Sequence, residues 1–169
     1  MRRLAIAALS VLALAAVPVA EAKSLRWASQ GDFLTMDPHA QNESLNNTAA
    51  SYIYESLLTY NEKFELVPAL ATSWNRDGNL LWRFNLRKGV KFHDGTPFNA
   101  DAVVFSHGRQ MKERKIKFFG KGWEIPAQER TPEYWVSMEM DKTVDSIEAV
   151  DDHTVVYKLK RVEAPQLPE

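Results

Sequence analysis

The clearest signal in this sequence is an alternation of apolar and mainly polar residues with a period of two. It covers residues 80–87, where the apolar positions are Leu80, Trp82, Phe84 and Leu86. A period of two places successive side chains on opposite faces, so this stretch predicts a strand with one buried face. Asp77-Gly78, just before it, is a hairpin turn signal. Gly89 interrupts the pattern, and we expect residues 90–92 to resume it before a turn at residues 94–97.

The last third of the chain repeats this arrangement. Residues 147–150 lead to a turn at Asp151-Asp152, and a second alternating stretch follows with Val155, Tyr157 and Leu159 as its apolar positions. We therefore predict a second hairpin. A short strand is also expected at residues 25–29. Residues 65–70 are expected to be extended, and Pro68 restricts them to an edge strand or a non-strand.

Two segments show the steps of three and four residues that are typical of a helix with one buried face. Ser44 is suited to cap the first helix. Its expected apolar stripe is Leu45, Ala49, Tyr52 or Ile53, and Leu57. Asn99 is a good N-cap for the second helix, and Asp101 in the first turn favours the helix dipole. We expect Val103, Val104 and Met111 to face inward, and Gly108 to weaken this helix.

Residues 112–134 are poorly patterned and predict a long loop, with room for a short helix. Strands mixed with two good helices predict an α+β (mixed α/β) fold.

The N-terminus has the three parts of an export signal. Arg2 and Arg3 are followed by an apolar run from residue 4 to residue 17, and Ala20-Glu21-Ala22 supplies the small residues that a signal peptidase requires. The apolar run is shorter than the roughly 20 residues that span a bilayer. We therefore predict a signal peptide cleaved after Ala22 and a periplasmic location.

The amino-acid composition excludes several classes of function. The 169 residues carry 21 Lys and Arg against 22 Asp and Glu, so there is no basic surplus and we expect no nucleic-acid partner. The chain has no Cys, which excludes a disulfide framework, a thiolate nucleophile and a Cys-ligated zinc site.

Candidate catalytic chemistry is sparse. His93-Asp94-Gly95 places an imidazole beside a carboxylate, but neighbouring strand residues point to opposite faces, and a β-turn is the simpler interpretation. The sequence shows neither metal-ligand spacing such as HExxH nor a GxSxG nucleophile motif, and it has no phosphate-binding glycine loop. We expect no metal and no cofactor, and the sequence favours binding over catalysis.

Two other features allow alternatives. Trp123 and Trp135 lie in or beside the irregular segment and could form a stacking platform for sugars, although packing under a loop is the commoner role of such residues. A basic run is most simply a solvated loop, and its members are Lys112, Arg114, Lys115, Lys117 and Lys121. An exported carbohydrate-binding module, or a hydrolase with paired carboxylates, therefore stays open as an alternative.

One long motif resembles a known family. Residues 68–74 (PALATSW), residues 82–98 (WRFNLRKGVKFHDGTPF) and residues 99–106 (NADAVVFS) resemble the family 5 extracellular solute-binding proteins, which serve peptide and nickel ABC transporters. Residues 36–39, 53–58, 147–155 and 164–165 continue the resemblance. Ser56 departs from the family, which usually has Gly there, and residues 112–145 follow no family pattern.

The resemblance implies a fold and a function. Family members are about three times longer and close two lobes around a solute. The chain would be the N-terminal part of a two-lobed periplasmic-binding-protein type II-like fold, mostly the smaller subdomain of lobe one. The implied boundaries are a signal peptide at 1–22, an opening strand and loop at 23–46, the smaller subdomain at 47–162 and a truncated return segment at 163–169.

The implied function is capture of a di- or oligopeptide and its delivery to an ABC permease, by a protein that is monomeric at full length. Cleft lining carries over only to the end of the first strand, at Gln30, Gly31, Asp32 and Phe33. The resemblance also implies that the isolated chain does not bind solute, and that the long motif is scaffold.

Overall fold

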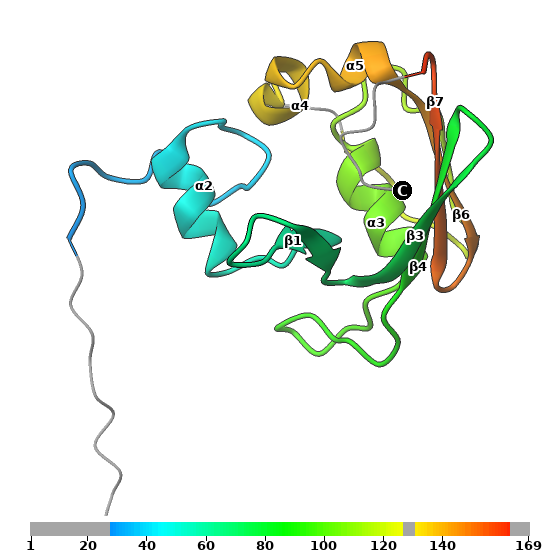
Figure 1. The fold of residues 1–169 in the computed structure, drawn as a ribbon, viewed down its shortest axis with the longest axis horizontal. Coiled ribbons are helices and arrows are strands. Elements are labelled where there is room, and N and C mark those ends of the chain that lie inside the picture. Colours follow the sequence, from blue (N-terminus) through cyan, green and yellow to red (C-terminus); the bar gives the residue numbers. More distant parts are fainter. Residues whose placement is uncertain (1–27, 127–130, 163–169) are drawn as a thin grey trace, which may run out of the picture. The chain divides into compact units, whose positions relative to one another are not determined.

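A computed structural model of the chain describes residues 28–126 and 131–162 (Figure 1). The chain divides into two compact units, residues 1–30 and residues 31–169. All helices and strands described here belong to the second unit. The predicted signal peptide, residues 25–27 of the first predicted strand and residues 163–169 lie outside the described residues. Residues 28 and 29 are not in a strand.

The second unit is built on a five-stranded sheet with the order β3-β4-β7-β6-β5. The strands are β3 (Ala71–Asp77), β4 (Leu81–Leu86), β5 (Ile116–Lys117), β6 (Val144–Asp151) and β7 (Thr154–Leu159). Neighbouring strands are antiparallel except for β5 and β6, which are parallel. Both predicted hairpins are confirmed, because β3 pairs with β4 across the turn at Gly78, and β6 pairs with β7.

Helix α3 (Ala100–Gly108) packs against β6 and β7 and covers one face of the sheet (Figure 1). The Asn99 side chain accepts a hydrogen bond from the Ala102 amide at 3.0 Å, so the predicted N-cap is confirmed. Val104 from the helix and Ile147 and Val155 from the sheet are fully buried. The core therefore lies between this helix and the central strands.

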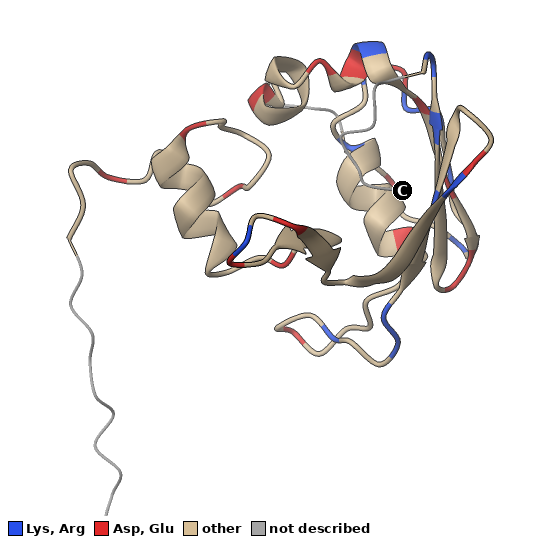
Figure 2. Cartoon of the chain, viewed as in Figure 1, with Lys and Arg blue, Asp and Glu red and all other residues tan. Residues whose placement is uncertain are grey.

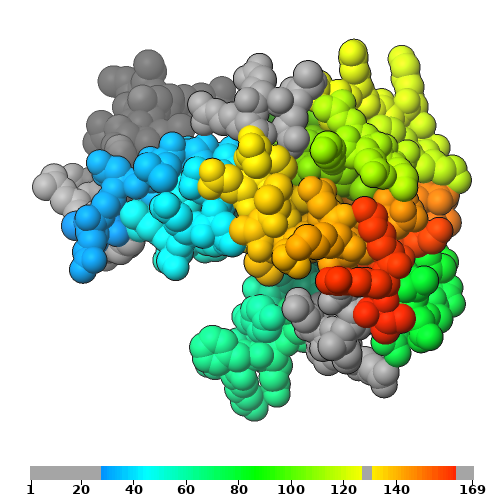
Figure 3. Space-filling model, turned by 90° about the horizontal axis from the view of Figure 1, so that it is seen from above, coloured from blue at the N-terminus to red at the C-terminus, as the bar shows by residue number. Residues whose placement is uncertain are grey.

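The other elements flank this core. Helix α2 (Ser44–Ser51) precedes a two-stranded antiparallel sheet of β1 (Leu58–Tyr60) and β2 (Leu66–Pro68), which stands out in teal in Figure 3. Two short helices, α4 (Glu133–Ser137) and α5 (Met140–Thr143), lead into β6. Within the described residues, none of the helices is long and apolar enough to cross a bilayer.

Three local predictions were wrong in detail. Ser44 is the first residue of α2 and not its cap, because Glu43 occupies the N-cap position without a side-chain hydrogen bond. The helix ends at Ser51, so Tyr52 is 81% exposed instead of continuing the buried stripe. Residues 90–92 form no strand, because Gly89 turns the chain with φ at 74° and leaves Phe92 half-exposed.

The segment predicted as a loop is also more ordered than expected. Ile116 and Lys117 pair with Ile147 and Glu148 as the edge strand β5. Helix α4 begins only at Glu133, so the described part of residues 112–134 contains no more than its first two residues. Gly108 ends α3 under Ile116, where an added Cβ would lie 2.8 Å from the Ile116 Cγ2 atom.

Candidate functional site

The segment predicted to contact solute is exposed. Gln30, Gly31, Asp32 and Phe33 all lie outside regular secondary structure, and Phe33 has 42% of its surface exposed. A Cβ atom at Gly31 would make an ordinary contact of 3.5 Å with Leu45, so packing does not require glycine there. Solvent access is compatible with solute contact, and binding by these four residues stays a prediction.

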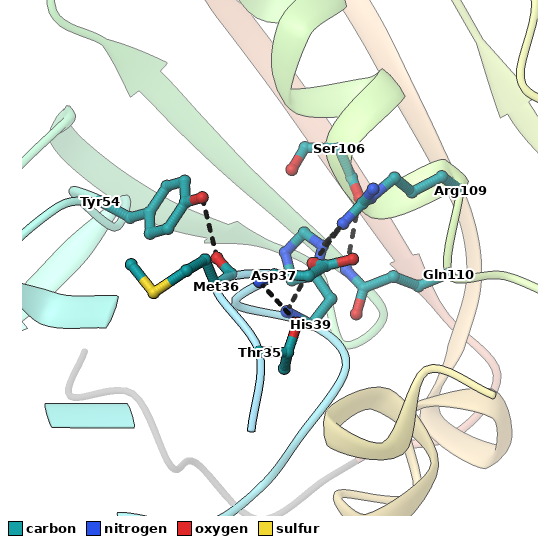
Figure 4. Close-up of polar contacts among 8 residues, drawn as sticks. All are labelled: Thr35, Met36, Asp37, His39, Tyr54, Ser106, Arg109 and Gln110. Atoms are coloured by element: carbon teal, nitrogen blue, oxygen red, sulfur yellow. Dashed lines mark hydrogen bonds and ion pairs between the residues drawn. The ribbon is translucent and has the colours of Figure 1, made fainter. Parts of the chain in front are cut away.

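The loop that follows this segment is tied to α3 by an arginine. Arg109, directly after the helix, donates a hydrogen bond from Nη2 to the Asp37 carboxylate at 2.5 Å (Figure 4). The Asp37 carboxylate also accepts the backbone N–H of His39 at 3.0 Å, and the Asp37 amide donates to the Thr35 hydroxyl at 3.1 Å. The charge pair thus fixes a turn that is itself closed by side-chain hydrogen bonds.

His39 is the second contact of Arg109. Its Nδ1 atom lies 3.0 Å from Arg109 Nη2 and 3.3 Å from Arg109 Nε (Figure 4). An arginine has no acceptor, so Nδ1 must accept and the ring carries its proton on Nε2. Burial and the Arg109 charge lower the pKa of His39 from 6.5 to about 4, against the opposing effect of Asp37.

Other contacts hold the same loop to its surroundings. The Leu34 amide donates to the Asn46 side chain at 3.2 Å, and the Tyr54 hydroxyl donates to the Met36 carbonyl at 2.9 Å. The loop also contacts α4 through an Asn42–Ser137 hydrogen bond of 2.8 Å. Residues 34–42 are therefore anchored to three helices.

A buried polar chain continues behind His39. The rings of His39 and His107 meet edge to face with centroids 6.3 Å apart, and His107 Nδ1 hydrogen-bonds the Tyr157 hydroxyl. Burial lowers the pKa of His107 to about 4 and raises the pKa of Tyr157. Trp135 packs beside His107 and donates to Asp141 at 2.8 Å. At pH 7 both histidines and Tyr157 are uncharged, and the Trp135 N–H has an acceptor, which suits a structural role for all four side chains.

The hollows in this unit are small. One lies under the loop between Thr35 and Ala50 and has about 10 Å³, room for roughly one water molecule. The buried Asn46 Nδ2 atom at its wall has no protein partner. A second hollow beside Met111 and Lys160 has about 90 Å³. Both are below the roughly 300 Å³ that a small-molecule site occupies.

The remaining candidates have structural explanations. Asp94 accepts hydrogen bonds from the Thr96 amide at 2.9 Å and the Thr96 hydroxyl at 2.6 Å, and these bonds lower the pKa of Asp94. The predicted turn at His93-Asp94-Gly95 is therefore confirmed, with Gly95 at φ 86°. No group of three or more His, Asp or Glu side chains placed to hold a metal occurs in residues 28–126 and 131–162.

The sugar platform proposed as an alternative is not formed. Trp135 has only 3% of its surface exposed, whereas Trp123 is half-exposed and packs edge-on against Phe105 and Phe118. The two tryptophans therefore do not present a common exposed face.

The basic run is largely paired with acceptors. Lys115 bridges Glu113 and Asp145 at 3.1 and 3.2 Å, and Lys117 pairs with Glu148. Arg114 donates to two backbone carbonyls. Figure 2 shows both charge signs interleaved over the unit. Such a surface gives no single-sign field toward a partner.

A sequence model described as bacterial extracellular solute-binding proteins, family 5 Middle, matches residues 65–169. The chain belongs to the family 5 extracellular solute-binding proteins. Its family resemblance is thus confirmed, and it covers both hairpins and the helix between them.

Individual relatives agree with this family. The dipeptide-binding protein of Escherichia coli (strain K12) is 32% identical over 176 residues, which cover 95% of this chain and 30% of the relative. The heme-binding protein A of Haemophilus influenzae is 35% identical over 127 residues, covering 70% of this chain and 22% of the relative. The chain thus spans less than a third of the length of the curated relatives that it matches.

A solved structure shows the same fold. The ABC transporter-associated periplasmic binding protein DppA from Helicobacter pylori, in complex with the peptide STSA, superposes with a TM-score of 0.64 at 33% identity. The superposition covers 79% of this chain and 26% of that one. The family 5 chain described here is therefore a mixed α/β part of a two-lobed periplasmic-binding-protein fold, as the family resemblance implied.

Proposed function

We propose that this chain is part of the substrate-binding component of an ABC importer. That protein captures a di- or oligopeptide in the periplasm and delivers it, chemically unchanged, to a permease in the inner membrane. It acts as a monomer, without a cofactor. The observation that carries the proposal is the family match over residues 65–169, together with a peptide-bound structural relative at 33% identity.

The described residues support a scaffold role for this part of the protein. The long family motif forms β4, the turn at residues 92–97 and the start of α3, and its apolar side chains Phe84, Leu86 and Phe98 are buried. The exposed segment at residues 30–33 is the part proposed to contact solute. We expect recognition to include strand-like pairing with the backbone of a bound peptide, which gives affinity without requiring one peptide sequence.

A non-peptide solute such as heme is the second candidate. It is favoured by the 35% identity with a heme-binding relative over 70% of this chain. The two candidates predict different ligands for the same protein.

A thermal-shift screen of the gene product that contains this chain tests both. A ligand present at 100 times its Kd stabilises the folded state by about 2.7 kcal/mol. We expect di- and tripeptides to raise the Tm, and Asp32→Asn to reduce that shift while Glu124→Gln, an exposed control, does not. A shift with heme alone would select the second candidate. A shift with oligosaccharides alone, or turnover of the added peptide, would refute both.

A further inference from the structure

Arg109 makes contacts beyond those that its place at the end of a helix requires. It lies at the C-terminal end of α3, where a cation interacts favourably with the helix dipole without any specific partner. Its guanidinium instead reaches a loop 70 residues earlier in the sequence, with hydrogen bonds to Asp37 at 2.5 Å and to His39 at 3.0 and 3.3 Å. Three bonds from one side chain fix both the position and the orientation of that loop.

The loop held by Arg109 directly follows the segment proposed to contact solute. Phe33 is the last residue of that segment, and the next amide, at Leu34, is bonded to Asn46. Asp37 and His39 are three and five residues further along the chain. Only Leu34, Thr35 and Met36 separate residues 31–33 from Asp37, so the loop that Arg109 holds is the point to which the exposed segment is attached.

The contact between Arg109 and His39 depends on the protonation state of the histidine. Nδ1 accepts from Arg109 only while it has no proton. Protonation removes this acceptor and places a second positive charge beside the guanidinium. The charged and titratable groups that face His39 are Asp37 on its own loop, His107 on α3 and Arg109 directly after α3, with Tyr157 of β7 behind His107.

We propose that Arg109 is a positioning residue for residues 31–33, which it holds in place through Asp37 and the unprotonated ring of His39. The role assigned to residues 31–33 rests on the proposed function, whereas the holding of the loop does not. Loss of either contact of Arg109 releases the loop from the end of α3, while its bonds to Asn46, Tyr54 and Ser137 stay in place and the sheet stays folded.

The sign of the pH dependence follows from the pKa of His39. The ring takes up a proton near pH 6.5 when the loop is released, but only near pH 4 when the loop is held. The ratio of the released to the held form of the loop therefore rises by up to tenfold for each pH unit as the pH falls from about 6.5 to about 4. Below about pH 4 both forms are protonated, and the ratio becomes constant.

Amide hydrogen exchange of the chain tests this proposal. At pH 7 we expect Arg109→Gln to lower the protection factors of the Leu34, His39 and Ala40 amides by at least tenfold, and to leave the β6–β7 amides unchanged. Arg87→Gln is the matched control, because Arg87 pairs with an exposed Glu55 at 3.5 Å. Equal protection in both variants would overturn the proposal, as would loss of protection throughout the sheet in Arg109→Gln.

A histidine variant separates positioning from a merely structural effect. Asn at position 39 can still offer Arg109 an acceptor oxygen, but it cannot be protonated. Between pH 6.5 and pH 4 we expect the wild-type loop to lose at least tenfold in protection, corrected for intrinsic exchange, and His39→Asn to lose little. His93→Asn, in an exposed turn, should respond as wild type does. An equal acid response in wild type and His39→Asn would contradict the proposal.

A solute titration keeps the two proposals apart. Peptides that bind the gene product more weakly after Arg109→Gln, with the wild-type pH profile flattened by His39→Asn, would support both. If exchange responds as expected but no solute binds the wild type, the proposed function fails and the holding of the loop stands. If solute binds but Arg109→Gln changes neither exchange nor affinity, the positioning role fails alone.

Discussion

Replacement of Asp101 by Asn should destabilise the chain far more than an isosteric change at a surface carboxylate does. Asp101 has only 8% of its surface exposed, and it accepts two backbone hydrogen bonds, from Phe119 at 2.7 Å and from Gly120 at 2.9 Å. An amide in its place keeps one acceptor oxygen and turns an N–H group toward the second backbone N–H. A hydrogen bond to a charged group contributes about 1.5–3 kcal/mol.

The Asn variant loses one of the two hydrogen bonds, weakens the other, and removes the negative charge that interacts with the dipole of α3. Together these losses give an expected destabilisation of about 2–3 kcal/mol. For a slope of about 1.5 kcal/mol per molar urea, the unfolding midpoint should fall by roughly 1.5 M. Urea unfolding followed by tryptophan fluorescence measures this shift. Glu124→Gln is the control, because Glu124 is exposed in the same region.

Gly120→Ala tests the same contact from the loop side. An added Cβ would lie 2.9 Å from the Asp101 Oδ2 atom, so it must displace the carboxylate or the loop. The loss should be smaller when Asp101 is already Asn, since the two changes break one contact. An Asp101→Asn variant within 0.5 kcal/mol of the Glu124→Gln control, a threshold typical of ordinary surface changes, would refute this reasoning.

Three further changes test other parts of the fold. Asn99→Ala removes the N-cap of α3 and should lower the free energy of unfolding by about 1 kcal/mol in urea denaturation, whereas no loss would contradict the cap. Gly108→Ala should destabilise because its Cβ meets Ile116 at 2.8 Å, and a double-mutant cycle with Ile116→Ala should recover part of the loss; simple additivity would exclude that contact. Burial lowers the pKa of His107 from 6.5 to about 4. Between these two pH values the unfolded chain binds a proton at His107 and the folded chain does not. The free energy of unfolding should therefore fall by up to about 1.4 kcal/mol for each pH unit from about pH 6.5 down to about pH 4. Denaturation at pH 7 and pH 4.5 measures this, and an equally steep fall in His107→Asn would contradict it.

Local sequence was enough for the elements that carry the fold. Alternation between residues 80 and 87, with Gly78 in the turn, specifies a hairpin whose partner strand is its neighbour in sequence. Asn99 signals a helix start because its side chain bonds an amide three residues away. Each of these signals lies within about ten residues, which is the reach of hydrophobic periodicity, turn chemistry and capping.

The misses share the opposite property. Ile116 and Lys117 have no strand pattern of their own and become β5 only because β6 offers a free edge. Trp135 is buried through contacts with Asp141 of α5 and His107 of α3. The sequence around Trp135 indicates neither contact. The helix stripe predicted to continue through Tyr52 stops because α2 itself ends at Ser51.

The candidate site divides in the same way. The exposed segment at residues 30–33 was reached through family resemblance, and no periodicity or motif in it pointed to binding. The contact of Arg109 with Asp37 joins residues 72 apart, so no pattern along the sequence could have paired them. The sequence did mark residues 36–39 (Met-Asp-Pro-His) as similar to the family. It indicated no contact partner for His39.

The central claim is that this chain serves a protein that binds a peptide and releases it unchanged. Calorimetric titration of the gene product with di- and tripeptides, followed by mass measurement of the released ligand, tests it most directly. We expect saturable one-to-one binding and recovery of the intact peptide. Absence of peptide binding under conditions where the protein is folded, or recovery of cleaved peptide, would contradict it.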